Sequence, residues 1–242
     1  MSLDPRRARF WHGLGLGPVW TARDAPGEPD ADAPAAVALS RNAAIAQMDW
    51  DRLEHAVADC TACGLCKART RTVFGVGSRA SEWMVIGEAP GAEEDLRGEP
   101  FVGQAGRLLD SILAAAGLDR TSSGRSAVYI ANVVKCRPPA NRNPEPDEAA
   151  RCEPFLMRQI ELVGPRVMLV MGRVAAQAIL GSDASIASLR GRAHRIDVAG
   201  TSVPVIVTYH PAYLLRNLAD KAKVWADLCL ARDVHRQACR PS

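Results

Sequence analysis

The sequence predicts an α/β fold in which helices cover both faces of a parallel sheet. Two observations carry this prediction: four short apolar runs rich in valine and isoleucine, and helical stretches between them. Strands and helices that alternate along a chain form parallel sheets. With 242 residues, of which 48% are hydrophobic, the chain can bury the core that such a domain needs.

The predicted strands are continuous apolar runs, which are typical of strands that are buried on both faces. They are WMVIGEAP at 83–90, AVYIANVVKC at 127–136, RVMLVMG at 166–172 and VPVIVTYHP at 203–211. Ligands in such sheets bind where the strands end. Three of the four runs end in polar residues, so we expect one crevice to hold the acidic loop after residue 87, Asn132 and His210.

Helical patterns surround and separate these runs. They cover 43–60, 104–118, 143–164, 173–180 and a closing helix at 212–237. Gly117 ends the second pattern, and Asn143 followed by Pro144 is a favourable start for the third. Pro154 should bend that helix.

Residues 1–40 are predicted to be a flexible N-terminal arm that precedes a domain at 41–242. Its segment APGEPDADAPAA lacks the apolar residues that a packed segment needs. Before it, RFWHGLGLGPVW holds two tryptophans among glycines. Two interpretations of that segment stay open: a tail that folds back on the domain, or a peptide that docks an unknown partner protein.

Composition bounds the environment of the protein. The chain has no run of 18 apolar residues and no secretory signal, so we expect no membrane association and a cytoplasmic location, and we predict a monomer. Only four of its 30 basic residues are lysines, and arginine is the better phosphate ligand. A GC-rich coding sequence explains that bias equally well, so the net charge of +3 does not establish nucleic-acid binding.

Seven cysteines suggest a metal centre, because a cytosolic chain should not hold a disulfide framework. The segment CTACGLC places Cys60, Cys63 and Cys66 in two successive C-x-x-C steps, and Cys136 and Cys152 offer two more thiolates. Four thiolates hold either zinc or a 4Fe–4S cluster. Spacing alone does not decide which four bind, and unconnected buried cysteines are the alternative. The remaining two, near the C-terminus, are interpreted as packing or surface thiols.

Six motifs in this order resemble the family-4 uracil-DNA glycosylases, the iron–sulfur members of that superfamily. They are CTACGLC, GEAPGAEED, PFVGQAG, NVVKCRPP, a cysteine on the following helix, and HPAYLLR. The similarity runs from about residue 51 to 233 and is specific only as a set. It implies a three-layer α/β/α sandwich with a central four-stranded parallel sheet. It also implies that Cys60, Cys63, Cys136 and Cys152 bind a 4Fe–4S cluster, which leaves Cys66 as the spare cysteine.

The resemblance assigns roles to the residues at the strand ends. A base inside a duplex must be flipped into a pocket before it can be cleaved. Phe101 matches the phenylalanine that stacks on the base, and its position between proline and a glycine-containing loop favours an exposed ring. Asn132 matches the residue that reads the Watson–Crick edge of uracil. His210 matches the histidine that stabilises the uracil anion near O2.

The acidic loop would supply the remaining chemistry. Glu88 is the first candidate for orienting the water and stabilising the positive sugar, with a water held by the backbone as the alternative. The better-known branch of the superfamily has an aspartate at the position of Ala89. Glu94 matches the position that crowds C5 and so refuses thymine. Gly87 and Gly91 belong to the same base-binding loop, where glycine lets the backbone approach closely.

Two residues after the histidine are predicted to contact DNA. Leu214 is chosen as the wedge that fills the gap left by the flipped base, although it could simply belong to the first turn of the closing helix. Arg216 is a phosphate contact. The resulting hypothesis is a monofunctional glycosylase that excises uracil from single- and double-stranded DNA and starts base excision repair. The alternatives are a glycosylase for another deaminated base and a non-catalytic iron–sulfur module that binds nucleic acid.

Overall fold

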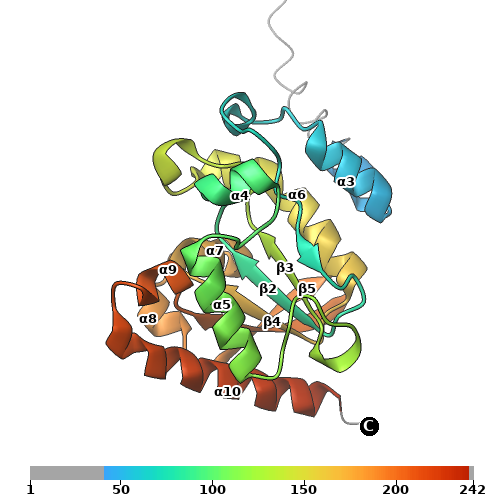
Figure 1. Cartoon of the computed structure of the whole chain (residues 1–242). Coiled ribbons are helices and arrows are strands. Elements are labelled where there is room, and N and C mark those ends of the chain that lie inside the picture. Colours follow the sequence, from blue (N-terminus) through green and yellow to red (C-terminus); the bar gives the residue numbers. More distant parts are fainter. Residues whose placement is uncertain (1–40, 240–242) are drawn as a thin grey trace, which may run out of the picture. The chain divides into compact units, whose positions relative to one another are not determined.

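A computed structural model describes residues 41–239, of which those from 44 onward form one compact unit (Figure 1). Residues 1–40, for which an arm and a docking peptide were predicted, lie outside the described range. The helices are α3 (Trp50–Ala58), α4 (Ala92–Arg97), α5 (Gln104–Ala115), α6 (Pro146–Val163), α7 (Arg173–Leu180), α8 (Ile186–Leu189), α9 (Pro211–Leu214) and α10 (Lys221–Ala238). The strands are β1 (Val76–Gly77), β2 (Trp83–Gly87), β3 (Val128–Asn132), β4 (Val167–Met171), β5 (Ala193–Val198) and β6 (Thr201–Thr208).

The sheet contains the four predicted parallel strands, in the order β3-β2-β4-β6. Two further strands extend it: β1 pairs antiparallel with β3, and β5 pairs antiparallel with β6. The described sheet therefore has six strands where four were expected. The sequence analysis missed β5 because its segment AHRIDV is polar and largely exposed, as an edge strand permits.

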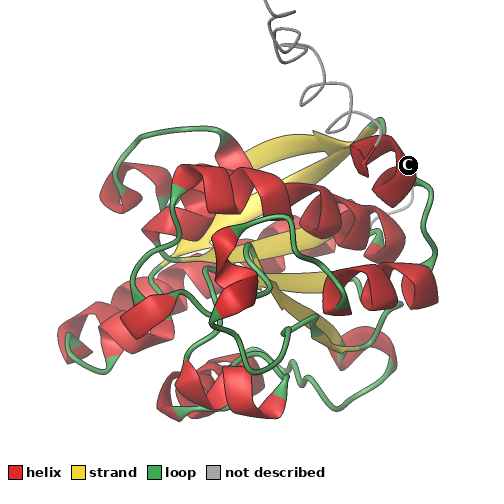
Figure 2. Cartoon of the chain, turned by 90° about the horizontal axis from the view of Figure 1, so that it is seen from above, coloured by secondary structure: helices red, strands yellow, loops and turns green. Residues whose placement is uncertain are grey.

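Helices cover both faces of the sheet, as predicted (Figure 2). Side chains along β2 alternate between two cores. Met84 and Ile86 pack with residues of α6 and α7, whereas Trp83 and Val85 pack with residues of α5 and α10. All five residues of β2 are buried, which is why the strand reads as a continuous apolar run.

The helix boundaries differ from the predicted ones at three places. The helix predicted at 43–60 is interrupted at residues 47–49, and α3 begins only at Trp50. Helix α6 begins at Pro146, after the N-cap residue Glu145, and not at Asn143. The predicted closing helix is divided into α9, a short 3₁₀ turn at Leu218–Asp220, and α10. This division matters for the site, because it leaves the α9 segment at the strand ends while α10 runs back along the sheet (Figure 1). Among residues 41–239, no helix is both long and apolar enough to cross a bilayer.

Candidate active site

The carboxyl ends of β2 and β3 are held together beyond the last paired residues. Gly87 pairs with Asn132 at the end of both strands. The ladder then continues, because Val133 N–H donates to the Gly87 carbonyl at 3.0 Å and Val134 N–H donates to the Glu88 carbonyl at 3.2 Å. This pairing fixes the start of the acidic loop beside Asn132.

A cavity of about 390 Å³ lies at these strand ends. It is lined by Glu88, Ala89, Pro90, Gly91, Glu94, Phe101, Ala105, Asn132, Pro138, Asn141, Arg142, Asn143, His210, Ala212, Tyr213 and Arg216. Eight of these residues were predicted from the sequence to bind the base, perform the chemistry or contact DNA. The crevice that was expected from the topology therefore exists, and the acidic loop, Asn132 and His210 all contribute to it.

Asn132 is 2% exposed, and its side-chain Oδ1 is buried without a hydrogen-bond partner among the described residues. A buried polar atom without a partner is costly, and in a pocket it indicates an acceptor that is reserved for a ligand. The main-chain carbonyl of Asn132 is held by a buried lysine. This carbonyl accepts a hydrogen bond from Lys135 Nζ at 2.8 Å, and the same buried ammonium donates to Gln159 Oε1 at 2.6 Å.

His210 presents a neutral imidazole with a defined tautomer. Its Nδ1 accepts a hydrogen bond from the Ala212 N–H at 3.1 Å, so the ring caps α9 and carries its proton on Nε2. Burial lowers the pKa of His210 from 6.5 to about 4, against the opposing effect of Glu94. At neutral pH the ring is therefore an uncharged donor.

Phe101 is 6% exposed, so the prediction of an exposed ring was wrong. Its ring stacks on His210 with centroids 5.4 Å apart and an interplanar angle of 28°. Glycines allow this packing. A Cβ at Gly87 would lie 2.6 Å from Phe101 Cζ, and one at Gly106 would overlap the Phe101 main chain. Phe101 is still among the residues that line the cavity.

Comparison with known proteins identifies the family. The model of the uracil DNA glycosylase superfamily matches residues 74–229. A type-4 uracil-DNA glycosylase of Archaeoglobus fulgidus is 43% identical over 169 residues, which cover 68% of this chain and 82% of the relative. Type-4 uracil-DNA glycosylases of Thermotoga maritima and Pyrobaculum aerophilum are 45% and 38% identical, covering 69% and 76% of this chain and 83% and 93% of their own lengths.

This chain belongs to the type-4 uracil-DNA glycosylase family. The resemblance recognised in the six sequence motifs is thereby confirmed. The roles of individual residues stay predictions, which the geometry of the site can support or correct.

Two carboxylates of the acidic loop of this type-4 family member have different surroundings. Burial raises the pKa of Glu88, and the charge of Arg173 partly opposes that shift. The carboxylate of Glu94, in contrast, accepts hydrogen bonds from three backbone N–H groups. Its Oε2 accepts from Gly91 N–H at 3.1 Å, and its Oε1 accepts from the N–H groups of Val102 and Gly103, both at 3.0 Å. Glu94 therefore fixes the loop that carries Phe101, a role that the sequence analysis did not foresee.

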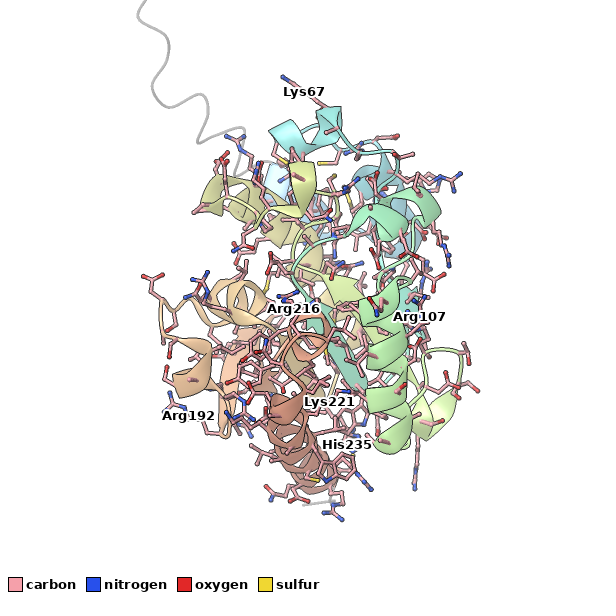
Figure 3. The ribbon with its side chains drawn as sticks, turned by 60° about the vertical axis from the view of Figure 1, so that its left-hand side comes forward. Lys67, Arg107, Arg192, Arg216, Lys221 and His235 are labelled. Carbon is pink, nitrogen blue, oxygen red and sulfur yellow. The ribbon has the colours of Figure 1, made fainter. Side chains whose placement is uncertain are left out.

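The structure contradicts the prediction that Leu214 is the wedge. Its side chain is fully buried at 0% exposure, because α9 packs this residue inward beside Leu108, Ile112 and Val224. Arg216 fits its predicted place better: it is exposed, follows α9 and lines the cavity (Figure 3). The sequence could not show the inward orientation, because neighbouring apolar residues of a short helix point to different sides.

The predicted cluster ligands Cys60, Cys63, Cys136 and Cys152 border one small cavity together with Cys66. None of these cysteines forms a disulfide, and no three of their sulfur atoms lie within 4.8 Å of one another. A tetrahedral zinc site needs sulfur atoms about 4 Å apart. The sulfurs of these five cysteines contain no such closely spaced set of three. Because Cys66 borders the same cavity, its exclusion stays a prediction.

Backbone and side-chain donors point at two of these sulfurs. Arg69 Nη1 donates to Cys136 Sγ at 3.2 Å, and Lys135 N–H donates to Cys152 Sγ at 3.3 Å. Hydrogen bonds to ligand sulfurs are a regular feature of iron–sulfur sites. Burial raises the pKa of Cys152 to about 11, and the charge and backbone N–H of Lys135 oppose that shift. The donor set therefore fits an iron–sulfur cluster.

The loop that links Cys136 to α6 also supplies cavity residues that the sequence analysis missed. Asn141 and Arg142 line the cavity, and Arg142 is held by Glu148 with an N–O distance of 2.7 Å. Ala140 and Asn141 both have positive φ values, near 53° and 55°. The sequence signal was present in the run of proline, asparagine and arginine, but turn residues alone do not say which way a loop faces.

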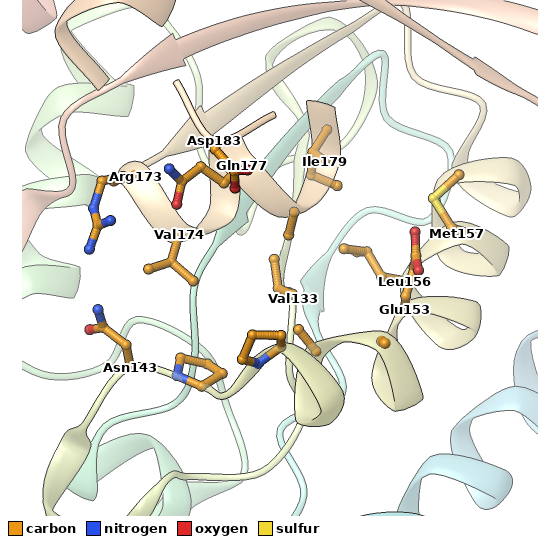
Figure 4. Close-up of a pocket in the computed structure, with 15 residues that line it drawn as sticks. Val133, Asn143, Glu153, Leu156, Met157, Arg173, Val174, Gln177, Ile179 and Asp183 are labelled. Carbon is orange, nitrogen blue, oxygen red and sulfur yellow. The ribbon is translucent and has the colours of Figure 1, made fainter. Parts of the chain in front are cut away.

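A second cavity, of about 440 Å³, lies between the start of α6 and α7 (Figure 4). Arg173 and Asn143 lie at one end of it, and Met157 lies at the other. Although this cavity is slightly larger, it contains neither an unpartnered buried acceptor nor a histidine among its described lining residues. The candidate active site is therefore the cavity at the strand ends.

Proposed function

We propose that this protein is a monofunctional uracil-DNA glycosylase, which flips uracil out of DNA and hydrolyses its N-glycosidic bond to start base excision repair. The observation that carries the proposal is the buried, unpartnered Oδ1 of Asn132 in a cavity that also holds a neutral histidine. Uracil offers a donor at N3 and an acceptor at O4, which one carboxamide can match with its acceptor and donor. The named activity of the type-4 relatives agrees with this assignment.

In the proposed reaction the flipped uracil lies against the ring of Phe101, and Asn132 reads its edge. As the bond between N1 and C1′ breaks, its electron pair passes to the uracil ring and charge develops on O2. The Nε2–H group of His210 donates to that oxygen. A preorganised neutral donor in a buried site is effective at this task because it needs no rearrangement when the charge forms.

Glu88 is assigned to the sugar side of the reaction. Its carboxylate stabilises the positive charge at C1′ and orients the water that adds there. The charge of Arg173 favours the ionised form of Glu88 and so opposes the effect of burial on the pKa of that carboxyl. The products are free uracil and an abasic site. Arg216, exposed at the rim, is assigned to a DNA phosphate.

We infer that Cys60, Cys63, Cys136 and Cys152 hold a 4Fe–4S cluster, which cross-links the segment after α3, the loop after β3, and α6. Hydrolysis of a glycosidic bond needs no electron, so the cluster is assigned a structural role. Iron and sulfide analysis of the purified protein should give about four irons per chain. Alanine at any of the four ligands should abolish the brown colour, and Cys66→Ala should retain it. Loss of the cluster only with Cys66→Ala would contradict the ligand set.

The function is tested by measuring free base released from matched single- and double-stranded oligonucleotides that contain uracil or hypoxanthine. The proposal predicts release of uracil from both forms and a much slower release of hypoxanthine. Faster release of hypoxanthine would favour a glycosylase for another deaminated base. Tight binding without release of either base would favour a non-catalytic module. Action as a monomer and a cytoplasmic location are part of the proposal and rest on the sequence alone.

A further inference from the structure

Three potential metal ligands meet at the amino end of β2, whose carboxyl end leads into the candidate active site. They are Glu82, immediately before β2, and His235 and Cys239 at the end of α10. His235 Nε2 lies 2.9 Å from Glu82 Oε2. Cys239 Sγ lies 3.7 Å from the same oxygen and 3.6 Å from His235 Nε2. The function proposed above uses none of these residues.

These separations match the edges of a tetrahedral zinc site. Zinc binds sulfur at about 2.3 Å and nitrogen or oxygen at about 2.0–2.2 Å, so tetrahedral angles place neighbouring ligand atoms about 3.3–3.6 Å apart. The two distances that involve sulfur need almost no change. The shorter nitrogen–oxygen distance belongs to the hydrogen bond that a metal ion would replace.

The three ligands are held by the fold. The main chain of Glu82 continues the pairing of β2 with β4, because its carbonyl accepts a hydrogen bond from the Arg166 N–H at 2.9 Å. Arg166 Nε lies 3.0 Å from Glu82 Oε1, which leaves Oε2 directed at the other two ligands. The ring of His235 packs on Trp83 with centroids 4.9 Å apart. A charged group that fixes one oxygen of a ligating carboxylate is a regular feature of metal sites.

Helix geometry places Cys239 beside His235. His235 and Cys239 are four residues apart, so both project from the same side of the last helical turn. Cys239 N–H donates to the His235 carbonyl at 3.0 Å, which continues the helical turn up to the cysteine. Cys239 is exposed, so one coordination position faces solvent and can take a water molecule.

We propose that Glu82, His235 and Cys239 form a second metal site, which binds one Zn²⁺ with a water as the fourth ligand. The ion would fasten the end of α10 to the start of β2. Lys221 and His235 lie at opposite ends of α10, about 21 Å apart along its axis. Because α9 leads into the first of these ends through the turn at Leu218–Asp220, zinc at the other end should stabilise the fold without changing uracil release (Figure 1).

The test uses the purified protein with its iron–sulfur cluster intact and one equivalent of Zn²⁺. X-ray absorption at the zinc edge reports only on zinc, so iron does not interfere. The expected shell contains one sulfur at about 2.3 Å and nitrogen or oxygen ligands near 2.0 Å. A shell of three or four sulfurs would place zinc at the cluster cysteines and overturn the proposal, as would zinc that is lost on gel filtration.

Two cysteine variants complete the test. Cys239→Ala should lose the sulfur from the zinc shell, and its exposed position after the last residue of α10 makes misfolding a minor concern. Cys229→Ala, in the same helix, should retain the wild-type shell. In thermal melts, Zn²⁺ at 100 times its dissociation constant should raise the Tm of wild type and Cys229→Ala by about 5–10 °C. An equal rise in Cys239→Ala would contradict the site.

Discussion

Replacing Gly87 with alanine tests whether Asn132 and Phe101 act as a fixed pair. The added methyl would lie 2.6 Å from Phe101 Cζ and closer still to Asn132 Oδ1, so both side chains must move. The backbone of Gly87 is held in place by the pairing of β2 with β3, so it cannot shift far enough to relieve the steric clash. Overpacking of this kind typically costs about 1–3 kcal/mol of stability.

The effect on activity should be larger than the effect on stability. A displacement of about 1 Å in a positioning group can reduce a rate by about 100-fold. We therefore expect Gly87→Ala to remain folded and to release uracil about 100-fold more slowly under single-turnover conditions. Stability is measured by urea unfolding, and base release is measured on the same preparation with an oligonucleotide that contains one uracil.

Gly103→Ala is the matched control. It adds the same methyl group in the same region, yet the atoms nearest to the new Cβ would be carboxylate atoms of Glu93, from 3.2 Å, and of Glu94, at 3.5 Å. Glu93 is exposed and can move aside. This variant should release uracil within a few-fold of the wild-type rate. Wild-type activity in Gly87→Ala would refute the reasoning, because it would show that the observed packing of Asn132 and Phe101 is dispensable.

Three further predictions follow from the site. Asn132→Asp should strongly reduce uracil release, because it removes the donor to O4. The same variant should be assayed for weak release of cytosine, because an aspartate can accept a hydrogen bond from the amino group of that base. Unchanged uracil release would assign base reading to another residue. Glu94→Ala should lower the free energy of unfolding in urea by about 1–3 kcal/mol and slow uracil release more than tenfold, because three N–H groups lose their acceptor. Glu94→Gln should recover part of the stability and part of the activity. A loss of activity without any loss of stability would contradict this positioning role. The pKa of His210 is about 4 in the folded protein and 6.5 when unfolded, so below pH 6.5 the unfolded state binds the proton first and stability is lost as pH falls towards 4. Over that window wild type should lose about 3 kcal/mol more than His210→Gln, and parallel stability curves for the two proteins would show that the pKa of His210 is not lowered in the folded protein.

The sequence predicted the part of the fold that buries apolar runs, and it failed where a feature depends on tertiary direction. The four parallel strands were recognisable because burial on both faces makes each run continuously apolar. The edge strand β5 has only one covered face and a polar sequence, so no such signal existed. The inward orientation of Leu214 depends on how α9 packs on α5, which no local pattern encodes.

The candidate site was predictable to a similar extent. Residues at strand ends converge because of the topology, and the family motifs selected Asn132 and His210 among them. Neither source could show that Glu94 is occupied by three backbone donors, or that Lys135 supports the carbonyl of Asn132 from below the site. Both contacts depend on how the loops after β2 and β3 fold, which the local sequence does not show.

The most direct test of the account is the single-turnover rate of uracil release by His210→Ala, measured beside wild type on the same oligonucleotide. The account assigns His210 to the charge that develops on O2, through a neutral ring whose proton lies on Nε2. Removal of one such donor should lower the rate by about 100- to 1,000-fold while leaving DNA binding intact. A rate within a few-fold of wild type would contradict the central claim, because the cavity at the strand ends would then not be where the bond is cleaved.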